Sequence, residues 1–159
     1  MAIRQIRYDG DDILKKVSKK VEFLDEKTKL FIQDLKETMY KYDGIGISAV
    51  QVGVLKRIII YDVSYIDDPK NKKPIALINP VITYKSKKTK VAEEGCLSFP
   101  KYFGKVIRPS KIIVEALNEN FEKVTINASG IEAVVLQHEI DHLDGNLFVD
   151  LAFDTYYER

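Results

Sequence analysis

The sequence is short of the side chains that form cross-links or bind soft metal ions. Its 159 residues include one cysteine and two histidines. A single cysteine excludes an internal disulfide, so we expect a reducing cytoplasm, where a thiol can serve as a metal ligand or nucleophile. A metal site made from soft ligands would have to draw on these three side chains.

The chain also lacks a prevailing charge and a long apolar run. Lys and Arg number 25 against 24 Asp and Glu, a formal net charge of +1. This balance gives no argument for nucleic acid or an anionic membrane as partner. No apolar stretch approaches the ~20 residues of a spanning helix, and the first twelve residues are not typical of a secretory signal. The basic run "KSKKTK" (85–90) has no aromatic residues between its lysines, which predicts a solvated turn.

Two helices and a block of short strands can be predicted from periodicity. Residues 25–44 show apolar side chains near a 3.6-residue period, with Asp25 as N-cap and Gly44 as stop. The predicted apolar face consists of Leu30, Phe31, Leu35, Met39 and Tyr42. Residues 129–145 form a second helix, with a capping box from Ser129 to Glu132 and Gly145 in the left-handed position at its end. The strands are expected at residues 56–63, 75–78, 81–84, 90–93, 105–107, 112–117 and 123–126.

This order predicts one domain over residues 1–159. Its fold class is α+β, with mainly antiparallel short strands around a central metal-binding helix and an N-terminal amphipathic helix.

The second helix contains both histidines in "QHEIDHLDG" (137–145). Residues four apart share a helix face, so His138 and His142 can direct their rings at one point. Glu139 completes the pattern H-E-x-x-H, in which two imidazoles hold a metal ion and the glutamate is a general base. Asp141 and Asp144 have a different helical phase, and we interpret them as solvated carboxylates.

Cys96, in "EEGCLSFP", is the one strong soft ligand left for a third position. In isolation, a lone cysteine is most often a small buried hydrophobe. Two histidines and one cysteine leave one coordination position open, which indicates a catalytic rather than a structural site. Cys96 could alternatively be a nucleophile with a histidine as base, but Glu139 and the second histidine would then have no role.

Three segments together resemble the motifs of the peptide deformylase family. They are "GIGISAVQ" (44–51), "EGCLS" (94–98) and "QHEIDHL" (137–143), in the family's order and spacing. The resemblance spans residues 13–150, and "EGCLSFP" with the absence of a long insertion resembles the bacterial type 1 branch. It implies an enzyme that removes the formyl group from the initiator methionine of new polypeptides.

The resemblance also implies roles for individual residues. Cys96, His138 and His142 would hold the metal ion, and Glu139 would be the general acid and base. Gln51 would donate its side-chain amide to the developing oxyanion, together with the backbone N–H of Leu97.

Further positions match the family's supporting structure. Glu94 and Arg108 would form an ion pair, and the backbone of Gly44, Ile45 and Gly46 would hold the peptide as an added strand. Ser48 departs from the alanine that usually occupies its position. The hydroxyl is small and can form a local hydrogen bond, so we expect it to be tolerated.

Helical phase suggests where the methionine side chain would bind. Ile131, Val134 and Val135 precede His138 by seven, four and three residues and share its face. They would form an apolar wall beside the metal ion. The alternative is ordinary core packing, and one helix face can serve both purposes over different parts of its width. Two imidazoles and a thiolate suit Zn²⁺; the resemblance implies Fe²⁺ as the physiological ion, with Zn²⁺, Ni²⁺ or Co²⁺ able to replace it.

Two other functions remain open on the sequence alone. One is a zinc peptidase, which would usually need a further His or Glu downstream, where only Glu158 is present. The other is a metal-binding module without activity. The expected partners are N-formyl-methionyl nascent polypeptides, with no nucleic acid or membrane, and the expected oligomeric state is a monomer.

Overall fold

Strand β2 (Ile58–Tyr61) lies at the centre of the fold and is buried on both faces. In the computed structural model, which describes residues 2–159, Ile58 and Ile60 pack against α1 (Glu26–Lys41), while Ile59 and Tyr61 face α2 (Gly130–Leu143). Alternation of side chains along a strand explains how one apolar run serves two cores.

All strand pairs are antiparallel and belong to two sheets. The five-stranded sheet has the order β1-β2-β3-β6-β7, and the three-stranded sheet has the order β4-β5-β8. Apart from β2, the strands are β1 (Gly46–Ser48), β3 (Ile75–Lys85), β4 (Thr89–Cys96), β5 (Phe99–Pro109), β6 (Lys111–Leu117), β7 (Lys123–Ser129) and β8 (Phe153–Tyr157). The predicted α+β class with antiparallel strands is confirmed.

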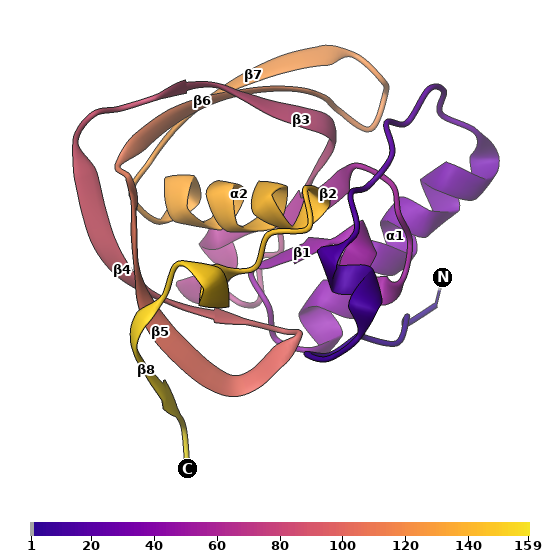
Figure 1. Ribbon diagram of the computed structural model, residues 1–159. Coiled ribbons are helices and arrows are strands. Elements are labelled where there is room, and N and C mark those ends of the chain that lie inside the picture. The colour runs from indigo at the N-terminus through magenta and orange to yellow at the C-terminus, as the bar shows by residue number, and fades with distance from the viewer. Residues whose placement is uncertain (1) are drawn as a thin grey trace.

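Helix α2 runs through the middle of the molecule, below β3, β6 and β7 and beside β4 and β5 (Figure 1). Apolar residues from β5, the 3₁₀ turn Phe148–Asp150 and Leu14 form a third core cluster at this end of the fold. Since sheets lie on different sides of it, nearly all of α2 after its first turn is buried. No helix among residues 2–159 is both long and apolar enough to cross a membrane.

Several predicted details of the elements are wrong. Asp25 does cap α1, accepting a hydrogen bond from Thr28 N–H (2.8 Å), but Asp43 rather than Gly44 takes the left-handed conformation after the helix, with φ of 57°. Leu30, assigned to the apolar face, is 61% exposed. The predicted strands at 75–78 and 81–84 are one strand, β3, with a bulge near Asn79.

The predicted C-terminal end of α2 is confirmed, whereas its predicted N-terminal cap is wrong. Gly145 has φ of 75°, as expected of the residue that ends a helix. The capping box is wrong, because Ser129 makes no side-chain hydrogen bond at the cap. Glu132 instead accepts a hydrogen bond from Tyr61 Oη (3.1 Å) on β2.

Candidate active site

The two histidines of α2 and the cysteine at the end of β4 meet at one point. One ligand atom from each of Cys96, His138 and His142 lies within 4.8 Å of the other two. Cys96 Sγ is 3.3 Å from His142 Nε2. Two ligands of one tetrahedral zinc ion, at their usual bond lengths, would be about 3.6 Å apart. The donor atoms therefore fit a shared metal ion, with two nitrogens and one sulfur as ligands.

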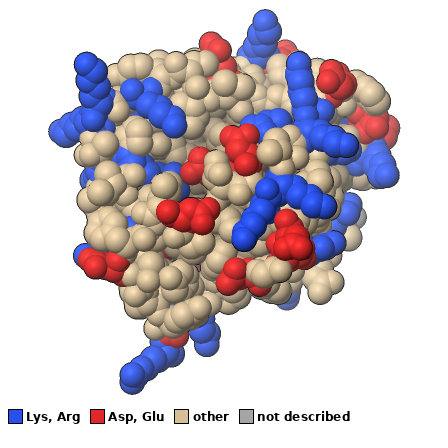
Figure 2. Space-filling model, viewed as in Figure 1, with Lys and Arg blue, Asp and Glu red and all other residues tan. Residues whose placement is uncertain are grey.

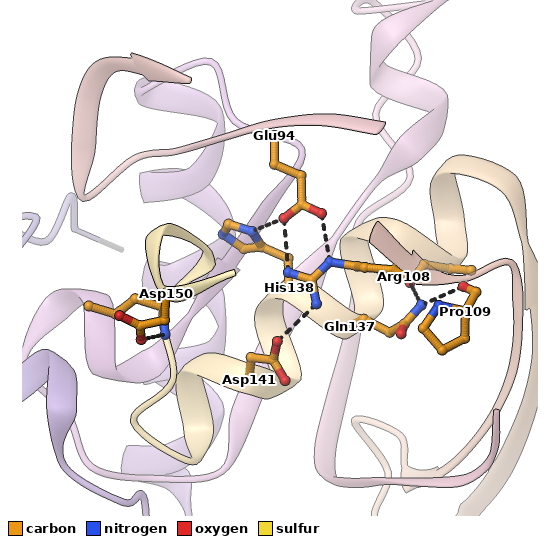
Figure 3. Close-up of polar contacts among 9 residues, drawn as sticks. Glu94, Arg108, Pro109, Gln137, His138, Asp141 and Asp150 are labelled. Atoms are coloured by element: carbon orange, nitrogen blue, oxygen red, sulfur yellow. Dashed lines mark hydrogen bonds and ion pairs between the residues drawn. The ribbon is translucent and has the colours of Figure 1, made fainter. Parts of the chain in front are cut away.

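A buried ion pair fixes the orientation of His138 (Figure 3). Glu94 Oε1 lies 2.9 Å from His138 Nδ1, which leaves Nε2 for a metal ion. Arg108 donates to both oxygens of Glu94, from Nε at 2.6 Å and from Nη2 at 2.9 Å. Burial raises the pKa of Glu94, but hydrogen bonds from His138 and Arg108 outweigh it, so the pKa is lowered and Glu94 stays charged.

Asp141 extends this pair to a chain of four side chains. Arg108 Nη1 donates to Asp141 Oδ2 at 2.9 Å, and the Asp141 side chain is 28% exposed. The interpretation of Asp141 as a solvated carboxylate is therefore wrong. Asp144 is nearer to that description, being 49% exposed, although it pairs with Arg57 at 3.0 Å.

Glu139 is buried beside the three ligand residues. Its Oε1 has no hydrogen-bond partner within residues 2–159. Burial, with repulsion from Glu94, raises its pKa from 4.5 to about 7. A Cβ at position 46 would lie 2.6 Å from Glu139 Oε2, which is too close. Only glycine therefore allows β1 to pass this near to the Glu139 carboxylate. A carboxyl with a pKa near neutrality is suited to accept and return a proton.

Gln51 is held with its amide nitrogen toward the cysteine. Its Oε1 accepts hydrogen bonds from Ser48 N–H (2.9 Å) and Ser48 Oγ (3.0 Å). Its Nε2 therefore points the other way, where it donates to Cys96 Sγ (3.3 Å) and Ser98 Oγ (3.2 Å). The hydroxyl of Ser48 adds a second restraint on the Gln51 carboxamide.

A cleft of about 580 Å³ opens over these residues. Of the residues singled out in the sequence, the following line it: Gly44, Ile45, Gly46, Glu94, Cys96, Leu97, Ile131, Val134, Val135, His138 and Glu139. Ile131 is 51% exposed, whereas Val135 is buried. A Cβ at Gly44 would lie 2.9 Å from Leu97 Cδ1, so a glycine is needed for the close contact between the two walls.

Two further contributions to the site could not be predicted from the sequence. The N-terminal segment donates from Arg7 N–H to Gln51 O (2.7 Å) and from Asp9 N–H to Ser98 O (2.8 Å), which ties two walls of the site together. Phe103 of β5 also lines the cleft. The hydrogen bonds from Arg7 and Asp9 join backbone atoms, so they do not depend on the type of residue. No local sequence pattern could therefore have predicted them.

Two imidazoles, a thiolate and a buried carboxylate, all at or beside a cleft in an α+β fold, are typical of metal-dependent hydrolases with the H-E-x-x-H helix. The family model described as polypeptide deformylase matches residues 3–155. The chain belongs to the polypeptide deformylase family.

Its relatives cover nearly the whole chain. A peptide deformylase from Acetivibrio thermocellus is 49% identical over 94% of this chain and 84% of its own. One from Natranaerobius thermophilus is 42% identical over 100% of this chain and 98% of its own. The crystal structure of peptide deformylase from Thermotoga maritima has a TM-score of 0.89 at 41% identity, covering 96% of this chain and 99% of that chain. The peptide deformylase from Ehrlichia chaffeensis in complex with actinonin has a TM-score of 0.90 at 37% identity, covering 97% and 91%.

Proposed function

We propose that this peptide deformylase removes the N-formyl group from the initiator methionine of new polypeptides at the Cys96, His138 and His142 site. The observation that carries the assignment of the site is the buried Glu139 carboxyl, which stands next to the three ligand residues and has no partner for Oε1. When bound, a divalent ion supplies a Lewis acid and lowers the pKa of water.

The side chains divide the remaining chemistry. Glu139 takes the proton of the attacking water and returns it to the departing amine, giving formate and a free N-terminus. Gln51 Nε2 and the Leu97 N–H donate hydrogen bonds to the oxyanion of the tetrahedral intermediate. The bonds from Ser48 to Gln51 Oε1 support this role, because they keep the amide donor turned toward Cys96.

The peptide portion binds as an extended strand in the cleft. β1 and β4 are the terminal strands of the two sheets, so each has one edge without a neighbouring strand. Gly46 begins β1, and the backbone of Gly44 and Ile45 leads directly into that edge. Strand addition along this backbone supplies affinity without dependence on side chains. The methionine side chain enters toward α2, against Ile131, Val134 and Val135.

Fe²⁺ is the proposed physiological ion, and Zn²⁺, Ni²⁺ or Co²⁺ can replace it. The mixed nitrogen and sulfur set supports a transition metal over Mg²⁺ or Ca²⁺. One catalytic domain over residues 1–159 is in keeping with a family match over residues 3–155. The proposed state is a monomer, and the proposed location is the cytoplasm. On the face shown in Figure 2, basic and acidic side chains are interspersed, which supports the absence of nucleic acid and membrane partners.

The test is the comparison of formyl-Met-Ala-Ser, acetyl-Met-Ala-Ser and free formyl-methionine with anaerobically prepared Fe²⁺ protein. An added methyl group must displace an oxyanion donor or shift the carbonyl, so kcat/KM for the acetyl peptide should be at least ~100-fold lower. Free formyl-methionine should also react more slowly than the tripeptide, since it lacks the strand pairing. Equal values for the formyl and acetyl peptides would show a general amidohydrolase instead.

A further inference from the structure

The C-terminal strand β8 lies beside β5 (Figure 1). Its Tyr156 is opposite Phe103, a residue that lines the cleft. In the three-stranded sheet Gly95 is opposite Phe103, and Phe103 is opposite Tyr156. Residues opposite one another in antiparallel strands share a face of the sheet. Gly95, Phe103 and Tyr156 therefore form a row that starts one residue from Cys96 and runs away from the metal ligands.

The two rings of this row form a continuous aromatic surface, here called the Phe103–Tyr156 shelf. Their centroids are 5.7 Å apart, with planes tilted by 30°. Tyr156 is held by a hydrogen bond from its hydroxyl to Glu93 Oε1 (2.9 Å). The Phe103 ring covers Gly95, where a Cβ would lie 2.6 Å from Phe103 Cε1, so only glycine permits this contact.

The shelf is on the outer face of the sheet and continues the cleft. Glu93, Gly95 and Phe103 all line the cleft, while Tyr156 is 46% exposed just beyond Phe103. Glu94, which lies between Glu93 and Gly95 on β4, points to the other face of the sheet, toward His138 on α2. An extended peptide beside β4 has the same alternation, so a first side chain directed at α2 puts the second side chain outward.

We propose that the Phe103–Tyr156 shelf is the subsite for the side chain of the residue that follows methionine, and that it favours aromatic side chains there. This inference rests on the proposed function. Of the charged residues around the shelf, Glu93 bonds to Tyr156 and Lys105 lies 3.7 Å from Asp154, while Lys101 also lines the cleft. Two tilted rings offer a third ring an offset or edge contact of the kind that aromatic pairs favour.

The test measures kcat/KM for formyl-Met-Phe-Ser, formyl-Met-Ala-Ser and formyl-Met-Ala-Phe with the metal-loaded full chain. In the unaltered protein the first peptide should exceed the second by roughly three- to tenfold, the range that an aromatic pair contributes. Tyr156→Ala should lower that ratio at least about twofold, whereas Tyr156→Phe, which keeps the ring, should retain it. Because both values come from one preparation, loss of folded protein cancels from the ratio.

Tyr157→Ala is the matched control. Tyr157 is the next residue of β8, but it lies on the opposite face, where its ring is 4.7 Å from that of Tyr102. The subsite is overturned by equal kcat/KM for the Phe and Ala peptides, or by a Tyr157→Ala variant that lowers the ratio as much as Tyr156→Ala. It is also overturned if the effect of Tyr156→Ala appears at the third residue, in formyl-Met-Ala-Phe. Failure to deformylate any of the three peptides would instead overturn the proposed function, and the subsite with it.

Discussion

At the scale of single residues, the environment of Glu139 is the most unusual feature of the site. The side chain is 4% exposed, and burial raises its pKa from 4.5 to about 7. The folded metal-free protein therefore binds this proton more tightly than the unfolded chain. The stability contributed by protonated Glu139 is fully present below pH 4.5 and is lost as the pH rises through 7.

Changing Glu139 to Gln should separate the chemistry from metal binding. The variant should bind the metal ion stoichiometrically, because Glu139 is not among the three ligands, yet lose turnover by at least ~10²-fold, as expected for a general base. In the metal-free state it should be more stable than the unaltered protein at pH 8, by up to about 3 kcal/mol, with little difference at pH 5. Metal analysis, formyl-peptide turnover and urea unfolding at the two pH values provide the measurements.

Loss of the metal ion together with turnover would show that Glu139 is a ligand. An equal stability difference at pH 5 and pH 8 would show that its pKa is not raised.

Residue identity predicted the chemistry of this site better than its conformation. The H-E-x-x-H spacing and a single cysteine are enough to name Cys96, His138 and His142, which the structure brings within 4.8 Å. The left-handed residue after α1 could not be named in the same way. Asp43 takes that role while Gly44 is needed for its contact with Leu97, and a pattern search assigns the nearest glycine to the helix end.

At the scale of elements, Arg108 on β5 joins the two elements that carry the metal ligands. It binds Glu94, two residues before Cys96 on β4, and Asp141, which lies between the histidines on α2. Arg108 and Glu94 are about 5% exposed, so their charges interact with little screening. This connection sets the spacing between the sulfur ligand and the two nitrogen ligands.

Changing Asp141 to Asn should therefore weaken metal binding although Asp141 does not touch the ion. We expect a loss on the order of tenfold in affinity, the lower end of what supporting contacts to ligands provide. Asp144→Asn is the matched control. It removes a carboxylate three residues further along, whose partner Arg57 is not bonded to a metal ligand side chain. Competition with a chromophoric chelator for Zn²⁺ gives both affinities, and equal losses would contradict a specific role for Asp141.

Elements whose boundaries depend on neighbouring residues in sequence were predictable. The Asp25 cap and the Gly145 end are local, and both are present. The Ser129 capping box failed because Tyr61, far away in sequence, binds Glu132. β1 and β8 are short strands whose pairing depends on β2 and β5. Neither contains a periodic pattern long enough to predict a strand.

At the scale of the whole molecule, the site is assembled from segments that are distant in sequence. Gln51 comes from the turn after β1, Cys96 from β4 and the histidines from α2. The N-terminal segment secures this arrangement by binding Gln51 O and Ser98 O. Residue types and spacing were enough to group the three metal ligands, but the place of Gln51 beside them followed only from the resemblance of three ordered motifs to one family.

Because its ligands come from both β4 and α2, the metal ion should stabilise the whole fold. A ligand that binds only the native state at 1,000 times its Kd contributes about 4 kcal/mol. For a chain of this size, that corresponds to a fall in Tm of roughly 8–16 °C when a chelator removes the ion. Thermal unfolding of the Zn²⁺ form, with and without chelator, measures the shift.

The Cys96→Ala variant should lose most of that response, since one of three ligands is gone, and its Tm should stay close to that of the metal-free protein. Mg²⁺ is the control ion for the unaltered chain. It prefers oxygen ligands and should restore no stability after chelation, whereas Zn²⁺ or Ni²⁺ should restore it. A Cys96→Ala variant that Zn²⁺ stabilises as fully as the unaltered protein would remove the thiolate from the metal site and leave the two histidines to bind the ion with another partner.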